Sequence, residues 1–120
     1  MAAISTALMT FLGTGDHIVL QQTLYWGTYN FAVTQLEKFG ISYSFTKGWE
    51  VEDFEKELLP NTKLIYIETP SNPLLTITDL KAVSDLAGQH GVLTMIDNTF
   101  ASPINQNPVD FGIDIVLHSA

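Results

Sequence analysis

The residues of this chain that are suited to chemistry lie in two short polar strings, each directly after an apolar run. The first string is Glu68-Thr69-Pro70-Ser71-Asn72-Pro73, after residues 64–67, and the second is Asp97-Asn98-Thr99-Phe100, after residues 92–96. Apolar runs of this length predict buried strands. Open α/β sheets bind their ligands at the carboxyl ends of the strands. We therefore expect the two strings to meet at one ligand-binding edge.

Asp97 is the candidate for charge stabilisation. A carboxylate beside a buried strand is costly unless it is paired. One interpretation is a turn-forming side chain at the strand exit, since Asp-Asn-Thr suits that position. The other is an ionised partner for a cationic group such as a pyridinium nitrogen, which keeps the ring protonated and able to accept electrons. The pattern by itself leaves both open.

Three further side chains each allow a structural and a functional interpretation. Asn72 stands between two prolines, which predicts either a rigid turn or a polar side chain held over a ligand. Tyr25 follows the strand expected at residues 17–20, and its ring either stacks on a planar ligand or packs against the core. Ser119 is either a phosphate ligand or a local hydrogen bonder.

Metal and nucleotide sites are not indicated. His17, His90 and His118 are far apart in the sequence and have no partner at metal-ligand spacing. We expect His17 and His90 to lie at turns or helix ends. No glycine-rich phosphate fingerprint is present, because Gly13-Thr14-Gly15 is too short for one.

Composition excludes several classes of protein. The 120 residues are 46% hydrophobic, enough for one small domain with a core, and carry a net charge of −8. This charge argues against nucleic-acid binding, which needs clustered basic residues. There is no apolar run of membrane-spanning length, no basic leader and no cysteine, so the cytoplasm is the expected location. The chain has five lysines and no arginine, so a guanidinium clamp for a substrate carboxylate must come from elsewhere.

Hydrophobic periodicity predicts alternating helices and strands, and hence an α/β fold with a parallel sheet and helices on both faces. The last strand would have no helix to cover it, so it is expected to form an unfinished sheet edge. The expected helices are residues 3–12, 28–39, 51–58 and 80–90, and the expected strands are 17–20, 41–45, 64–67, 92–96 and 113–117.

Taken together with the terminal Leu117-His118-Ser119-Ala120, the two strings resemble the pyridoxal-phosphate (PLP) enzymes of Cys/Met metabolism. This group includes cystathionine γ-synthase, cystathionine γ-lyase, methionine γ-lyase and O-acetylhomoserine sulfhydrylase. The resemblance runs from Met1-Ala2-Ala3-Ile4 to Ser119-Ala120. It implies a fold-type I large domain of which residues 1–120 are a part, cut before the Schiff-base lysine.

The resemblance also implies roles for single residues. Met1 and Ser119 match phosphate-binding positions, the first through its backbone at a helix N-terminus. Tyr25 matches the tyrosine that stacks on the cofactor ring and helps in acid–base steps, and is the one catalytic candidate. Three more residues match positions that contact the cofactor ring. Asn72 matches the residue that bonds to the phenolic oxygen, Asp97 the carboxylate that pairs with the ring nitrogen, and Thr99 a threonine that packs against the ring. Glu68 is expected to support this shell through hydrogen bonds.

The implied activity is replacement or elimination at the γ-carbon of a sulfur amino acid. The strings Ser71-Asn72-Pro73-Leu74-Leu75 and Gln106-Asn107-Pro108 favour a cystathionine γ-synthase, which joins O-acylhomoserine and cysteine. Cystathionine or methionine γ-lyase is the alternative. The family further implies homodimers or tetramers with shared sites.

The chain departs from the family pattern in several places. No lysine of this chain lies in the Schiff-base motif, which would follow just beyond Ala120, so the 120-residue chain alone is expected to be inactive. Trp26 replaces the first glycine of the usual Tyr-Gly-Gly, and it either narrows the substrate side or packs outward. Two other interpretations remain: a catalytically inactive remnant, and an unrelated α/β binding domain.

Overall fold

The computed structural model describes residues 2–69, 78–99 and 106–118. Its five strands form one parallel sheet in the order β2-β1-β3-β4-β5. The strands are β1 (His17–Leu20), β2 (Ser42–Phe45), β3 (Thr62–Glu68), β4 (Leu93–Asp97) and β5 (Ile115–Leu117). The α/β class with a parallel sheet, expected from the alternating pattern, is confirmed.

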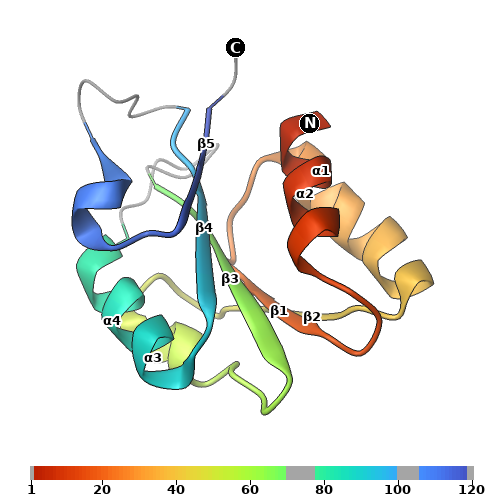
Figure 1. Ribbon diagram of the computed structural model, residues 1–120, viewed down its shortest axis with the longest axis horizontal. Coiled ribbons are helices and arrows are strands. Elements are labelled where there is room, and N and C mark those ends of the chain that lie inside the picture. Colours follow the sequence, from red (N-terminus) through yellow and green to blue (C-terminus); the bar gives the residue numbers. More distant parts are fainter. Residues whose placement is uncertain (1, 70–77, 100–105, 119–120) are drawn as a thin grey trace.

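Helices cover both faces of the sheet (Figure 1). One face carries α1 (Ala2–Phe11) and a second helical stretch of α2 (Trp26–Phe31), η1 (Ala32–Leu36) and η2 (Glu37–Phe39). The other carries α3 (Val51–Glu55), α4 (Leu80–His90) and η3 (Pro108–Phe111). In the described part of the chain, no helix is both long enough and apolar enough to cross a membrane.

Side chains along each strand point alternately to the two faces of the sheet, so the hydrophobic core consists of two clusters, one on each face. The cluster beneath α1 and α2 contains Leu20, Tyr66 and Met95, whereas the cluster beneath α3 and α4 contains Ile65 and Ile96. Successive strand residues point to opposite faces, so Glu68 continues the face of Tyr66, and Asp97 continues that of Met95. The polar strand ends therefore emerge on the side of α1 and α2.

Two glycines end helices as the sequence predicts. Gly40 and Gly91 have φ of 72° and 66°, the left-handed region that glycine adopts without steric cost. At the other end of α4, the Asp79 carboxylate accepts a hydrogen bond from Ala82 N at 3.1 Å, as an N-cap residue does. These caps fix where α4 leaves and rejoins the sheet.

Several boundaries differ from those expected. The helix expected from residue 28 begins at Trp26, because the Tyr25 carbonyl already accepts hydrogen bonds from Thr28 N and Tyr29 N at 3.0 and 3.1 Å. The helix expected over 51–58 is α-helical only to Glu55. The strand expected over 92–96 extends to Asp97, and that expected over 113–117 begins at Ile115. Tyr25 is thus an N-cap residue, and Asp97 is the last residue of β4.

The strand expected over residues 17–20 places His17 correctly, whereas the expectation that His17 lies at a turn or helix end is wrong. It is the first residue of β1 and is 1% exposed. Its Nδ1 lies 2.7 Å from Thr62 Oγ1, and its Nε2 lies 2.8 Å from Ser44 Oγ. A neutral imidazole pairs with two hydroxyls, which donate or accept as its tautomer requires. Burial lowers the pKa of His17 from its ordinary value of 6.5, and the carboxylate of Glu57 opposes that shift.

We expect His17 to make stability depend on pH. Because its pKa is lower in the folded state, the unfolded chain takes up the proton first as the pH falls. Its contribution is therefore complete above 6.5 and declines below it. Denaturant unfolding between pH 5 and pH 8 measures this slope, which His17→Gln should reduce. The exposed His90, at the end of α4, provides the control His90→Gln. An equal slope in His17→Gln and the parent would contradict the assignment.

Candidate functional site

The first residues of the two polar strings lie side by side, as expected. Glu68 and Asp97 are register partners at the ends of β3 and β4, and Asp97 is the partner of Leu117 at the end of β5. All three strands are parallel, so their carboxyl ends form one edge of the sheet. The N-terminus of α1 lies at this same end of the molecule (Figure 1).

The carboxylate of Asp97 is half-buried and held by its own turn. Its Oδ1 accepts hydrogen bonds from Thr99 N at 3.0 Å and from Thr99 Oγ1 at 2.5 Å. The turn interpretation of Asp97 is therefore correct for this oxygen. Its Oδ2 makes no hydrogen bond with any described residue. An oriented carboxylate with one oxygen left over is suited to a cationic N–H donor.

Tyr25 is joined to this edge by Glu68. The Glu68 side chain is 4% exposed, and its Oε2 accepts a hydrogen bond from Tyr25 N at 3.1 Å. Tyr25 itself is 41% exposed, so this residue is accessible to solvent beside the strand ends. The structure thus brings together Tyr25, Glu68, Asp97 and Thr99. The other three predicted site residues, Met1, Asn72 and Ser119, lie outside the described residues.

Sequence reasoning missed a set of amides behind these residues, of which Asn98 and Gln21 are buried and Gln106 is half-buried. Gln106 Nε2 donates to Asn98 Oδ1 at 2.7 Å and to Thr69 O at 3.0 Å, and Asn98 Nδ2 donates back to Gln106 O at 3.0 Å. Gln21, which is fully buried, bonds to Glu68 in the same way. Asn98 could have been found from its place in the second string. Nothing in the sequence separates the buried Gln21 from the exposed Gln22 beside it.

Two buried hydroxyls lie on the face of the sheet that carries Asp97. Within the described ranges, neither Thr28 Oγ1 nor Tyr66 Oη has a hydrogen-bond partner of good geometry. Burial raises the pKa of Tyr66 well above its usual value, the charges of Asp97 and Glu68 act in the same direction, and the Thr28 hydroxyl opposes them. Tyr66 therefore stays a neutral phenol, which adds no charge beside the two carboxylates.

All five lysines of the chain lie on the surface. Lys81 pairs with Asp85 at 2.6 Å on the exposed side of α4, and among the described residues no hydrogen bond joins a lysine to Tyr25 or to the Asp97 carboxylate. The exposed lysines are Lys38, Lys47, Lys56, Lys63 and Lys81.

Trp26 packs outward. It is 69% exposed, and its ring stacks on Tyr29 with centroids 5.8 Å apart. Tyr29 in turn lies 5.2 Å from Phe45 on the edge strand β2. Of the two interpretations given to Trp26, the structure therefore favours outward packing.

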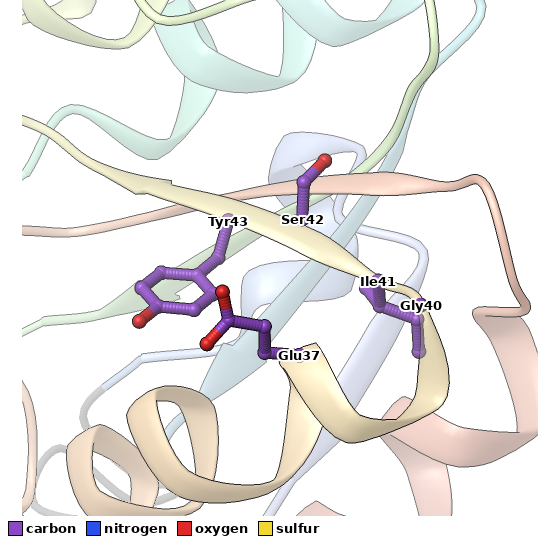
Figure 2. Close-up of a pocket in the computed structure, with 5 residues that line it drawn as sticks. All are labelled: Glu37, Gly40, Ile41, Ser42 and Tyr43. Atoms are coloured by element: carbon purple, nitrogen blue, oxygen red, sulfur yellow. The ribbon is translucent and has the colours of Figure 1, made fainter.

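A hollow of about 420 Å³ lies away from this edge, between η2 and β2. Figure 2 shows the carboxylate of Glu37 beside the ring of Tyr43, whereas Ser42 points away from both. Its lining residues run from Glu37 to Tyr43, at the amino end of β2. The strand ends with Asp97 lie at the opposite end of the sheet, so the hollow and the candidate site are separate.

Across the described ranges, no group of three or more His, Asp or Glu side chains is arranged to hold a metal ion.

Comparison with known proteins identifies the family. The family model described as Cys/Met metabolism PLP-dependent enzyme matches residues 1–120. The chain is 51% identical to cystathionine gamma-lyase of Bacillus subtilis and 49% identical to cystathionine beta-lyase MetC of the same organism, in both cases over all 120 residues. It spans 31% and 30% of those relatives.

A solved structure agrees with these matches. The crystal structure of metB from Corynebacterium glutamicum superimposes with a TM-score of 0.96 at 42% identity, covering 99% of this chain and 31% of that one. Family model, sequence identity and fold all lead to one assignment. The chain belongs to the family of Cys/Met metabolism PLP-dependent enzymes.

Proposed function

We propose that the complete protein containing this chain is a PLP-dependent enzyme that makes or breaks a carbon–sulfur bond of a cystathionine-type thioether. The observation that carries the proposal is the Asp97 carboxylate, held at the end of β4 with Oδ2 unbonded among the described residues. Bound PLP supplies an electron-withdrawing ring that stabilises negative charge on the carbon skeleton of an amino acid. That ring works best when its nitrogen is protonated.

The donor set of this edge fits such a ring. Asp97 would hold a proton on the ring nitrogen through Oδ2, while Thr99 fixes the carboxylate through Oδ1. Tyr25, exposed and anchored at its backbone, would lie against the ring face and move a proton at its phenolic oxygen. The N-terminus of α1, with no acidic residue in its first turn, suits the phosphate.

The remaining cofactor contacts follow from the family resemblance. We propose that Met1 and Ser119 bind the phosphate and that Asn72 binds the phenolic oxygen. The lysine that binds the cofactor would lie beyond residue 120, in the large domain of which this chain is a part.

Cystathionine is the product of the activity that the sequence favours and the substrate named for the two Bacillus subtilis relatives. The motif Ser71-Asn72-Pro73-Leu74-Leu75 favours the γ-synthase, which forms cystathionine from O-acylhomoserine and cysteine. The two Bacillus subtilis relatives are named as lyases of cystathionine. We therefore propose synthesis of cystathionine as the first candidate activity and its cleavage as the second. The complete protein would be a cytoplasmic homodimer or tetramer, and light scattering tests its mass.

An assay panel on the complete, PLP-loaded protein tests the function. Incubation with O-acylhomoserine plus cysteine should yield cystathionine. With cystathionine alone, cleavage at the γ-carbon releases cysteine and cleavage at the β-carbon releases homocysteine, so the released thiol identifies the reaction. Release of a keto acid from methionine as the main activity would overturn the synthase assignment. No turnover of any of these substrates by a protein that binds PLP would overturn the proposed function.

The 120-residue chain alone should not hold PLP covalently at this edge. After incubation with PLP and reduction with borohydride, mass spectrometry is expected to find no preferred lysine. A stable visible absorption band trapped on one lysine of this chain would contradict the proposal that the reacting lysine lies beyond residue 120. The complete protein treated in the same way is the positive control.

A further inference from the structure

Gln21 is the first residue after β1, where the chain leaves the sheet toward Tyr25. Its side chain is fully buried and makes four hydrogen bonds. Oε1 accepts from Glu68 N at 3.2 Å and from Thr78 Oγ1 at 3.1 Å. Nε2 donates to Glu68 O at 2.7 Å and to Thr23 O at 3.2 Å. An amide offers two N–H donors and two acceptor lone pairs, so the hydrogen-bonding capacity of Gln21 is fully used.

These bonds lead directly to Tyr25. Gln21 binds both backbone groups of Glu68 and so fixes that residue at the end of β3. The Glu68 carboxylate then accepts the N–H of Tyr25 at 3.1 Å. The bond from Gln21 to the carbonyl of Thr23 holds the same short segment two residues before Tyr25. The stretch from Gln21 to Tyr25 is therefore tied to β3 at two points.

We propose that Gln21 is a positioning residue, which sets the place of Tyr25 through Glu68 and Thr23. The proposal rests on the proposed function, because it gives Tyr25 its task at the cofactor. Gln21 itself touches neither substrate nor cofactor. Its fully bonded amide suits this role, since replacing it removes hydrogen bonds that hold the buried backbone of Glu68.

Two replacements of Gln21 differ in what they remove. Gln21→Met keeps the length of the side chain but loses all four hydrogen bonds. Gln21→Glu keeps the length and an acceptor, loses both donated bonds, and sets a second carboxylate beside Glu68 and its carbonyl. The neighbouring Gln22 is exposed, so Gln22→Met and Gln22→Glu are matched controls.

Hydrogen exchange tests the proposal without any cofactor. In the cofactor-free complete protein, the amide of Tyr25 should exchange at least about tenfold faster in Gln21→Met than in the parent, because its acceptor loses its support. Gln22→Met should leave that rate unchanged. Unchanged protection of Tyr25 in both Gln21 variants would overturn the proposal. If Gln21→Met does not fold, Gln21→Glu serves in its place.

A double-mutant cycle separates positioning from general destabilisation. We expect Gln21→Met to weaken PLP binding about tenfold and to alter the visible circular dichroism of the bound cofactor. In the Tyr25→Ala background the same change should have almost no further effect, since the group it positions is absent. Full additivity would overturn the proposal. A parent protein that binds no PLP would instead refute the proposed function, while hydrogen exchange still decides whether Gln21 holds Tyr25.

Discussion

Replacing Asp97 by asparagine is expected to lower kcat/KM of the complete protein by about 10²- to 10³-fold, because it leaves a buried cationic partner without its carboxylate. The asparagine Oδ1 can still accept both hydrogen bonds from Thr99, so the turn and the strand end should survive. The amide Nδ2 that replaces Oδ2 is a donor and repels a protonated ring nitrogen. The measurement is steady-state kinetics at saturating PLP, together with the absorption spectrum of the bound cofactor.

A matched control for Asp97→Asn is Asp110→Asn. Asp110 is an exposed carboxylate on η3, on the other face of the sheet. The control makes the same chemical change and removes the same charge, so we expect activity close to that of the parent. An Asp97→Asn protein within about threefold of the parent, which is less than 1 kcal/mol, would show that Oδ2 does not stabilise the ring.

Replacing Tyr25 by phenylalanine is expected to lower kcat by about 10²- to 10⁴-fold, the usual contribution of a positioned acid–base group. Phenylalanine keeps the ring that stacks on the cofactor and the backbone N–H that Glu68 accepts, but it has no proton to transfer. Affinity for PLP should therefore change little. In Tyr25→Ala, where the ring is also lost, PLP binding should weaken about tenfold. Kinetics and a PLP titration of the cofactor-free protein separate the two effects.

Tyr29 provides the control for Tyr25. Both are 41% exposed; Tyr29 lies in α2, and Tyr25 is the N-cap residue of that helix. However, the ring of Tyr29 packs between Trp26 and Phe45. We expect Tyr29→Phe to keep both kcat and PLP affinity. If Tyr25→Phe retains the kcat of the parent but Tyr25→Ala binds PLP weakly, then Tyr25 only stacks and another group moves the proton.

The predictions from sequence were most accurate for features that hydrophobic periodicity and ordered motifs determine, such as strands and helix ends. Hydrophobic patterning identified the five strands of the described part of the chain, and the glycines at positions 40 and 91 marked helix ends that the structure confirms. Errors arose at the ends of helices and strands, where a single hydrogen bond decides which residue belongs to the element. The Tyr25 carbonyl starts α2 two residues early. Hydroxyls from two neighbouring strands allow His17 to be buried at the start of β1, where a turn residue would be exposed.

The sequence by itself determined the fold class, the family and the position of Asp97 at the end of a strand, because these depend on residue order and on local patterns. Only the tertiary structure decided which residues support the site. Gln21 and Glu68 are 47 positions apart, so no local sequence pattern could have predicted their hydrogen bonds. Gln21 and Gln22 are the same residue type, yet the first is buried and the second exposed. The two glutamines differ in exposure because β1 pairs in parallel with β3. This pairing brings the carboxyl ends of two strands together that are distant in the sequence, and it buries the Gln21 side chain between them.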